Sequence, residues 1–426
     1  MIINKFARSA FLYRTAQLFS QGACIFLAPH FFDKVLTGYF FTMLSLASAQ
    51  TLFELGIGQT LLVMFAAYSI DDSEPKSSFL HPMNLLHATT KYIYLVSSCS
   101  FFVVGGILGF FILNSGGLEA SYWIYPWFLL CVAVAGNLYI NRGLIYVESV
   151  GRVQEVYSLR VVQVVSGGFL CALLILTGGE LWAVCAIPLS SLILGLFFLK
   201  RFFKLFGPPN SGANYSLSMI FKFYVARLFP LQWKVSISFI CGYLSLQFFL
   251  PLVFKFYGPV VAGQLGLALN VMTGVTLLSS SYSTGNIQVL SSLVASNNFR
   301  SLNSLVLKSI YFSVLVSTAV LLPFNVASSF VGGLSSLLPS HTVLLILTTA
   351  CLSNAVTYCC AIYLRSFHAE PLLIPSVIST FFLYVLLFTV GSKSLVLFVS
   401  SYALSSIFVL ACALTIGYER ANSVSA

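Results

Sequence analysis

Residues 92–113 read YIYLVSSCSFFVVGGILGFFIL, a run that contains no charged side chain. An α-helix rises about 1.5 Å per residue, so a run of this length crosses a hydrocarbon layer of about 30 Å. Similar runs recur along the chain, whereas the strands of a membrane barrel would be segments of about 10 residues with alternating polarity. Because the backbone must satisfy its own hydrogen bonds in lipid, these runs predict transmembrane helices.

The composition points the same way. Of the 426 residues, 58% are hydrophobic and 8% are charged, whereas an ordinary globular domain has about 25% charged residues. All ten cysteines lie inside apolar segments, which indicates small hydrophobic side chains within helices rather than a disulfide framework. The five histidines are scattered, so we expect neither a metal site nor a cofactor.

Hydropathy predicts an all-α membrane protein with about twelve transmembrane helices. The predicted spans are 9–30, 39–69, 92–113, 122–146, 156–177, 180–199, 222–249, 260–284, 306–331, 341–364, 371–390 and 395–417. This fold class excludes an ordinary soluble enzyme.

The longest loop, at 200–221, divides these spans into two sets of six. It reads KRFFKLFGPPNSGANYSLSMIF and joins a basic run to Gly-Pro-Pro and small polar residues, which are typical of linkers. We therefore predict an N-terminal lobe at 1–199, a linker at 200–221 and a C-terminal lobe at 222–426. Residues 36–56 align with 261–281 at a few identities, which suggests a parallel repeat with a substrate site between the lobes.

The distribution of basic residues predicts the topology. If the N-terminus is cytoplasmic and the spans alternate, all of the 21 lysines and arginines except Lys34, Lys234, Lys255 and Lys393 fall at or near the cytoplasmic side. Such a bias is what the positive-inside rule predicts. We therefore place both termini and the 200–221 loop in the cytoplasm. The net charge of +10 then reflects topology and requires no nucleic-acid partner.

Several catalytic patterns are missing from the sequence. It contains no G-x-x-x-x-G-K-[ST] phosphate loop. No Ser/His/Asp set or carboxylate pair lies in a loop large enough to form an active site, and a membrane glycan polymerase would be expected to carry such a loop outside. We therefore predict that the chain is not an enzyme, which leaves transport or a purely structural role.

Lys234 is the sharpest candidate for a substrate contact. It lies about 12 residues into the seventh span, about 18 Å of helix rise and close to the bilayer centre. Ionisable residues at that depth are costly and indicate function by default. Ser238, Cys241 and Ser245 follow on one face, and Pro230 would loosen the helix one turn earlier. The alternative is a lysine paired with a carboxylate for packing.

Glu54 lies near the centre of the second span. Gln50 and Gly58 lie one turn to either side on the same face, and Gly56 and Gly58 weaken the helix locally. We predict an ion-coupling or gating residue. Two alternatives stay open, namely an internal partner for a basic residue and a protonated glutamate that is hydrogen-bonded in packing.

Two arginines are further candidates for substrate binding. Arg14 shares one face of the first span with Gln17 and Gln21, and Arg142 lies near the cytoplasmic end of the fourth span beside Asn141. The alternative for Arg14 is a side chain that snorkels to the interface. For Arg142 the commoner role is a positive-inside anchor.

Gln264 and Asn270 of the eighth span are uncharged hydrogen-bonding groups that could contact sugars. Helix–helix hydrogen bonding is the commoner role for such residues in a membrane. The three candidate cations outnumber the one candidate carboxylate, which suits an anionic cargo better than a cationic drug.

Two stretches resemble a known family. Residues 27–61, LAPHFFDKVLTGYFFTMLSLASAQTLFELGIGQTL, resemble the N-terminal signature of Wzx-type polysaccharide flippases. In that family a Gly-Tyr pair opens the second helix and a segment like LFELGIGQ lies near its middle. Residues 146–163, YVESVGRVQEVYSLRVVQ, resemble the family's turn between helices four and five. The length, the twelve spans and the central basic loop agree with its layout.

The resemblance implies the multidrug/oligosaccharidyl-lipid/polysaccharide exporter superfamily, with two six-helix lobes around a central cavity that opens alternately to each side. It implies an undecaprenyl-pyrophosphate-linked cargo, usually an O-antigen repeat unit, that crosses the bacterial inner membrane toward the periplasm. Lys234 and Arg14 would then meet the pyrophosphate, and the other partners would be membrane lipids and further polysaccharide assembly proteins. A cation-coupled drug exporter, which would need more acidic residues, is the alternative, and a glycan polymerase is a more distant one.

Overall fold

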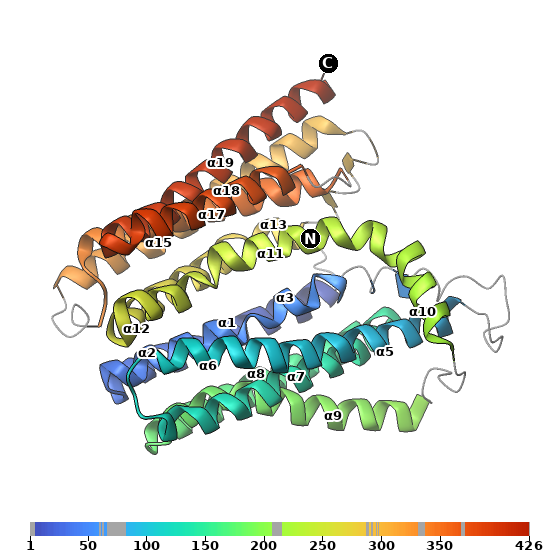
Figure 1. Ribbon diagram of the computed structural model, residues 1–426. Coiled ribbons are helices and arrows are strands. Elements are labelled where there is room, and N and C mark those ends of the chain that lie inside the picture. The colour runs from blue at the N-terminus through green and yellow to red at the C-terminus, as the bar shows by residue number, and fades with distance from the viewer. Residues whose placement is uncertain are drawn as a thin grey trace. The chain divides into compact units, whose positions relative to one another are not determined.

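Helices make up every regular element of the computed structural model in the part of the chain that it describes (Figure 1). That part comprises residues 5–58, 61, 64–65, 82–206, 215–286, 289–290, 293–294, 296, 298–330, 337–367 and 371–425. The predicted fold class, an all-α membrane protein with about twelve transmembrane helices in two lobes, is confirmed.

Wherever the structure describes them, the twelve predicted spans lie mainly on helices. The first half of the chain forms α1 (Lys5–Phe31), α2 (Lys34–Ala47), α3 (Gln50–Glu54), α5 (Pro82–Ser100), η1 (Phe101–Gly105), α6 (Gly106–Asn114), α7 (Ala120–Ser149), α8 (Val153–Leu176), η2 (Glu180–Cys185) and α9 (Ala186–Phe206). The second half forms α10 (Leu217–Phe223), η3 (Tyr224–Leu228), α11 (Phe229–Leu246), α12 (Phe249–Ser279), α13 (Ser281–Gly285), α15 (Phe299–Phe330), α17 (His341–Arg365), α18 (Leu373–Thr389), η4 (Gly391–Lys393) and α19 (Leu395–Ser425). Within the described residues, nine helical runs are long and apolar enough to cross a membrane.

The chain forms two compact units, Met1–Tyr243 and Leu244–Ala426. In the first unit α1 packs on α8, α8 on α9, and α5 on α7, and in the second α17 packs between α15 and α19. The division lies within α11, later than the loop at 200–221. The reason is that Tyr215 and Ile220, in the last part of that segment, pack against Leu85 of α5. The lobe boundaries predicted from that loop stay a prediction, and residues 207–214 lie outside the described part.

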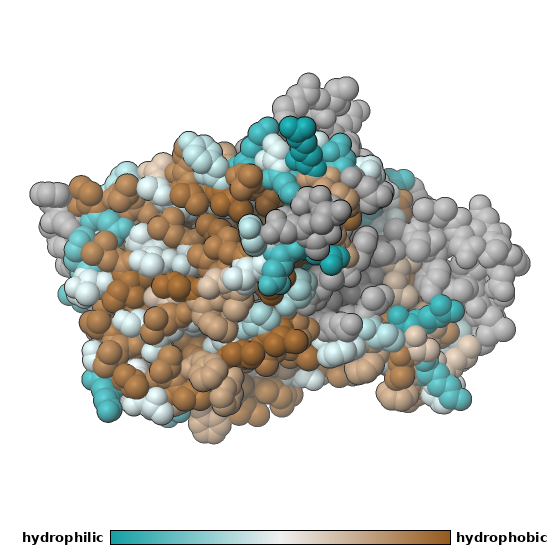
Figure 2. Space-filling model, turned by 90° about the horizontal axis from the view of Figure 1, so that it is seen from above, coloured by the Kyte–Doolittle hydropathy of each residue, from teal (hydrophilic) through white to brown (hydrophobic). Residues whose placement is uncertain are grey.

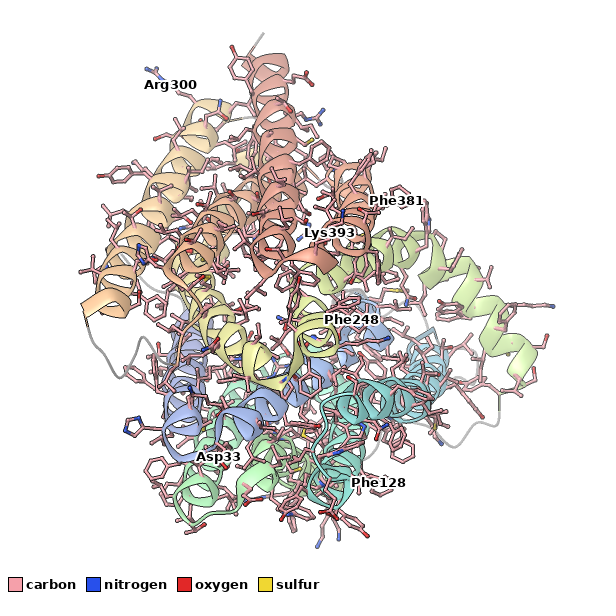
Figure 3. All side chains as sticks on the ribbon, turned by 60° about the vertical axis from the view of Figure 1, so that its left-hand side comes forward. Asp33, Phe128, Phe248, Arg300, Phe381 and Lys393 are labelled. Carbon is pink, nitrogen blue, oxygen red and sulfur yellow. The ribbon has the colours of Figure 1, made fainter. Side chains whose placement is uncertain are left out.

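Apolar side chains cover much of the face that Figure 2 shows. Phe128 of α7 is 58% exposed and Phe381 of α18 is 65% exposed, and both are labelled in Figure 3. By contrast, the charged side chain of Arg300 extends from the ribbon near the start of α15. Large exposed apolar side chains on long apolar helices fit a hydrocarbon surrounding. The chain is therefore a multi-pass membrane protein.

The cysteines behave as small hydrophobic residues. All ten are free, and most are buried. Cys24 of α1, for example, lies against the carbonyl oxygen of Gly168 on α8, with an Sγ–O distance of 3.6 Å.

Candidate functional site

The second predicted span is not one continuous helix. It begins as α2 and α3, and α3 ends at Glu54. Leu55 then adopts a left-handed conformation with φ 52°, and Gly56 follows with φ 66°. The sequence predicted a weak helix at Gly56 and Gly58, and the structure places a complete break there. Left-handed backbone is strained for a residue with a side chain, so contacts around the break must stabilise it.

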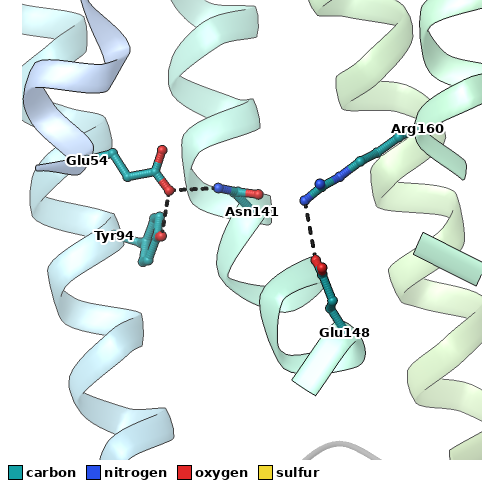
Figure 4. Close-up of polar contacts among 5 residues, drawn as sticks. All are labelled: Glu54, Tyr94, Asn141, Glu148 and Arg160. Atoms are coloured by element: carbon teal, nitrogen blue, oxygen red, sulfur yellow. Dashed lines mark hydrogen bonds and ion pairs between the residues drawn. The ribbon is translucent and has the colours of Figure 1, made fainter. Parts of the chain in front are cut away.

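The carboxylate of Glu54 makes the first of these contacts (Figure 4). Its Oε1 accepts a hydrogen bond of 2.9 Å from the hydroxyl group of Tyr94 on α5 and another of 2.9 Å from Nδ2 of Asn141 on α7. Tyr94 is fully buried. One carboxylate therefore joins the end of α3 to two neighbouring helices.

Gly58 leaves the space that this arrangement needs. A Cβ atom at Gly58 would lie 2.9 Å from Oε1 of Glu54 and 3.2 Å from Cδ1 of Ile145. A larger residue would push the carboxylate away from its two donors. The sequence pattern that placed Gly58 one turn after Glu54 therefore has a structural reason, which is the close approach of the side chain to the backbone.

The helix α11 makes the second contact with the break. The hydroxyl group of Ser236 lies 3.2 Å from the carbonyl oxygen of Leu55 and 2.8 Å from that of Gln232 on its own helix. A broken helix leaves carbonyl groups without intrahelical donors, and inside a membrane each needs another partner. Ser236 supplies one, so α11 supports the strained residue.

The turn between α7 and α8 holds two ion pairs beside this site. Nη2 of Arg160 lies 3.6 Å from Oε2 of Glu148, a pair that Figure 4 shows near Asn141, and Nη1 of Arg152 lies 2.5 Å from Oε1 of Glu155. Gly151 between them has φ 89°, a conformation that glycine adopts readily. The segment 146–163, which resembles the family's turn between helices four and five, is therefore a helix–turn–helix segment in which the Arg160–Glu148 pair joins α7 to α8.

The structure locates some of the predicted site residues only in part. Arg14 lies on α1 and Lys234 on α11, but the side chains of both lie outside the described part of the structure. Position 234 is two residues from both Gln232 and Ser236, which is about 200° around a helix with 3.6 residues per turn. The register therefore places it on a different face of α11 from Ser236.

The other candidates make local contacts. Nη2 of Arg142 donates to the hydroxyl group of Tyr139, 3.1 Å away, and its guanidinium carbon lies 4.6 Å from the centre of that ring. Nδ2 of Asn270 donates to the carbonyl oxygen of Gly266 on the same helix, at 2.7 Å, and Gln264 is half-buried on α12. The roles predicted for these residues stay predictions.

Sequence reasoning missed Tyr94 and Asn141 as partners of Glu54. They lie 40 and 87 residues away in the chain. In the sequence Asn141 stands out only as the neighbour of Arg142, and a tyrosine in an apolar run does not indicate a polar contact by itself. Only the packing of α5 and α7 brings these donors to the carboxylate.

The fold is that of transporters of the MOP superfamily. An inward-facing multidrug resistance MATE family transporter of that superfamily matches with a TM-score of 0.65 and 13% identity, over 100% of this chain and 97% of the other. The lipid II flippase MurJ, in an inward closed conformation, matches with a TM-score of 0.67 and 14% identity, over 96% of this chain and 86% of the other.

A MOP superfamily transporter from Pyrococcus furiosus, described by the reversed polarity of its binding pocket, matches with a TM-score of 0.56 and 13% identity. The aligned region covers 100% of this chain and 98% of the Pyrococcus furiosus protein. No family model matches the sequence, and no curated protein does. At these identities the likeness establishes the fold.

Proposed function

We propose that this chain is a flippase that moves undecaprenyl-pyrophosphate-linked O-antigen, or a related polysaccharide repeat unit, across the bacterial inner membrane. The cargo passes from the cytoplasmic to the periplasmic leaflet by alternating access, and both termini are cytoplasmic. The fold shared with a lipid II flippase supports this proposal. The resemblance of residues 27–61 to polysaccharide flippases supports it as well.

The charge within the spans is the observation that carries the proposal. In Leu244–Ala426 the acidic residues are Glu370 and Glu419, and both lie outside the predicted spans. In the first unit Glu54 already accepts two hydrogen bonds. A cationic drug would find few carboxylates here, whereas a diphosphate needs cations. The spans therefore suit an anionic head group.

In this proposal Lys234, Arg14 and Arg142 contact the pyrophosphate, and Gln264 and Asn270 contact the sugars. A sugar and diphosphate head needs a polar path, whereas the polyprenyl tail stays in the bilayer. Glu54 acts at the break of the second span as the coupling or gating residue, because a change in its protonation or partners would act directly on the strained backbone.

The experiment uses a bacterium that makes lipid-linked O-antigen repeat units but lacks its own flippase. We expect the wild-type chain to restore surface polysaccharide and Lys234→Ala to abolish it while the protein still accumulates in the membrane. Lys234→Arg keeps the charge and should be partly active. Lys393→Ala is the matched control, because that lysine lies at a helix end of the second unit. Full surface polysaccharide in Lys234→Ala would exclude Lys234 from the transport path.

A cation-coupled drug exporter is the second candidate, and the MATE family structures favour it. The same cells distinguish the two functions when they are loaded with ethidium. Efflux of ethidium without any surface polysaccharide would replace the flippase proposal with drug export.

A further inference from the structure

Three contacts define how α5 and α7 face each other. Oγ of Ser98 donates to the carbonyl oxygen of Ala135 at 2.7 Å. Tyr94 and Asn141 share the carboxylate of Glu54. Nearer the start of α5, the ring centres of His87 and Tyr146 are 5.5 Å apart. Residue numbers rise along α5 as they fall along α7, so the helices are antiparallel and this register is continuous over about three turns.

The register places two cations at one level. Between the His87 level and the Tyr94 level, the register puts Lys91 of α5 at the same height as Arg142 of α7. The charges of both residues act on His87. Lys91 is exposed and Arg142 is half-buried. This level lies at the cytoplasmic end of the two spans in the predicted topology, one turn from Glu54.

Neither cation is neutralised by a carboxylate in the described part of the chain. The ion pairs there are those of Arg152 with Glu155 and of Arg160 with Glu148. The described hydrogen bond of the Arg142 side chain goes to a neutral hydroxyl group, that of Tyr139. Two like charges at one level of neighbouring helices in a membrane are unfavourable unless an anion neutralises them.

His87 provides a second, independent sign of an absent ligand. It lies one turn before Lys91 on the same face of α5. Its ring is buried, packed against Phe65 at 6.3 Å and Tyr146 at 5.5 Å, yet its Nδ1 has no hydrogen-bond partner among the residues that the structure describes. A buried polar nitrogen without a partner is unfavourable and calls for an explanation.

The surface beside the cations is apolar. On α5, Tyr92, Leu95 and Val96 are 40%, 45% and 63% exposed. A cationic pair at the edge of an exposed apolar helix face fits a molecule with an anionic head and a hydrocarbon tail. A soluble anion would use the cations alone.

We propose that Lys91 and Arg142, with His87 beside them, form a binding site on α5 and α7 for the diphosphate of the lipid-linked cargo, with its polyprenyl tail along the exposed face of α5. This inference rests on the proposed function. Arginine binds phosphate oxygens through its planar fork, and lysine adds a compact charge. The carboxyl group of Glu54, whose Oε1 already accepts hydrogen bonds from Tyr94 and Asn141, bounds the site on its inner side, so the cargo is held here before it moves deeper.

The test measures binding of undecaprenyl pyrophosphate to the purified full chain in lipid nanodiscs. Replacing both cations, Lys91→Gln with Arg142→Gln, should raise Kd about tenfold or more, because two charge-assisted contacts are lost. The matched control is Lys200→Gln with Arg201→Gln, which removes the same charge from the end of α9 and should leave Kd unchanged. Exchanging the cations, Lys91→Arg with Arg142→Lys, should keep most of the affinity, and thermal unfolding shows that each variant is folded.

Two further probes identify the occupant. Inorganic pyrophosphate should bind more weakly than undecaprenyl pyrophosphate and should also depend on Lys91 and Arg142. Cardiolipin that binds as tightly as undecaprenyl pyrophosphate would show a bilayer-lipid site and overturn the cargo assignment. Unchanged binding of undecaprenyl pyrophosphate in the doubly substituted variant would overturn the site and leave the proposed function standing. If the wild type binds pyrophosphate through these cations but not undecaprenyl pyrophosphate, the proposed function fails instead.

Discussion

The two units of the chain use different polar chemistry between their helices. In the first unit a carboxylate, Glu54, joins three helices at a broken backbone. In the second unit, several hydrogen bonds between helices join neutral groups. Examples are the bond of 3.1 Å from Nδ2 of Asn354 to the hydroxyl group of Tyr402, and that of 2.9 Å from Nδ2 of Asn325 to Oγ1 of Thr348.

This difference indicates where a change of charge can act. Neutral hydroxyl, amide and thiol contacts change little with protonation, and in a membrane each contributes about 0.6 kcal/mol on average. A buried carboxylate depends strongly on its donors and on its charge. If transport is coupled to protons or cations, the first unit therefore carries the responsive group, and the second unit serves as the more constant partner.

The largest expected effect is that of Glu54→Ala. It leaves the donors of buried Tyr94 and half-buried Asn141 without their acceptor, so we expect the free energy of unfolding to fall by about 3 kcal/mol. Thermal and denaturant unfolding of the detergent-solubilised protein measure the change. Glu119→Ala is the control, because Glu119 is an exposed residue before α7. Equal stability of the two variants would remove the contrast between the units.

Glu54→Gln sharpens this result. Glutamine keeps an oxygen acceptor at the same place but cannot lose or gain a proton. We expect most of the stability to be retained, while flipping driven by a pH gradient in proteoliposomes is abolished. A glutamine variant with normal transport and normal stability would remove Glu54 from the mechanism.

A smaller effect is expected from Gly56→Ala at the break of the second span. A side chain at φ 66° is disfavoured by about 1–2 kcal/mol, so the unfolding temperature should fall. Gly242→Ala is the matched control, because an added Cβ there meets nothing within 4 Å on α11 and should stabilise the helix by up to about 1 kcal/mol. A stabilised Gly56→Ala would mean that the break is not the resting conformation.

The smallest effect should come from the second unit. Oγ of Ser283, which is buried, lies 3.1 Å from Sγ of Cys359. We expect Ser283→Ala to lower the free energy of unfolding by about 0.6 kcal/mol and to leave transport unchanged. A loss as large as that of Glu54→Ala would show that both units depend equally on their polar contacts.

The sequence by itself determined the fold class and the limits of most spans. The predicted span 341–364 corresponds to α17, His341–Arg365, and 371–390 corresponds to α18, Leu373–Thr389. Such limits are local, because each is set by where an apolar run meets polar or charged residues. That Glu54 is a polar residue within an apolar run, and that the helix is weak at Gly56 and Gly58, could also be predicted, since a carboxylate and two glycines within one apolar run are visible without a structure.

The tertiary structure decided what these residues contact. The left-handed backbone at Leu55, the donors Tyr94 and Asn141, and the support from Ser236 all depend on α5, α7 and α11 packing around the break. Hydropathy cannot supply such pairings, because it measures how much a segment prefers lipid and not which helix it faces. The level shared by Lys91 and Arg142 has the same origin, since it follows from the antiparallel register of two helices whose separate sequences contain no record of it.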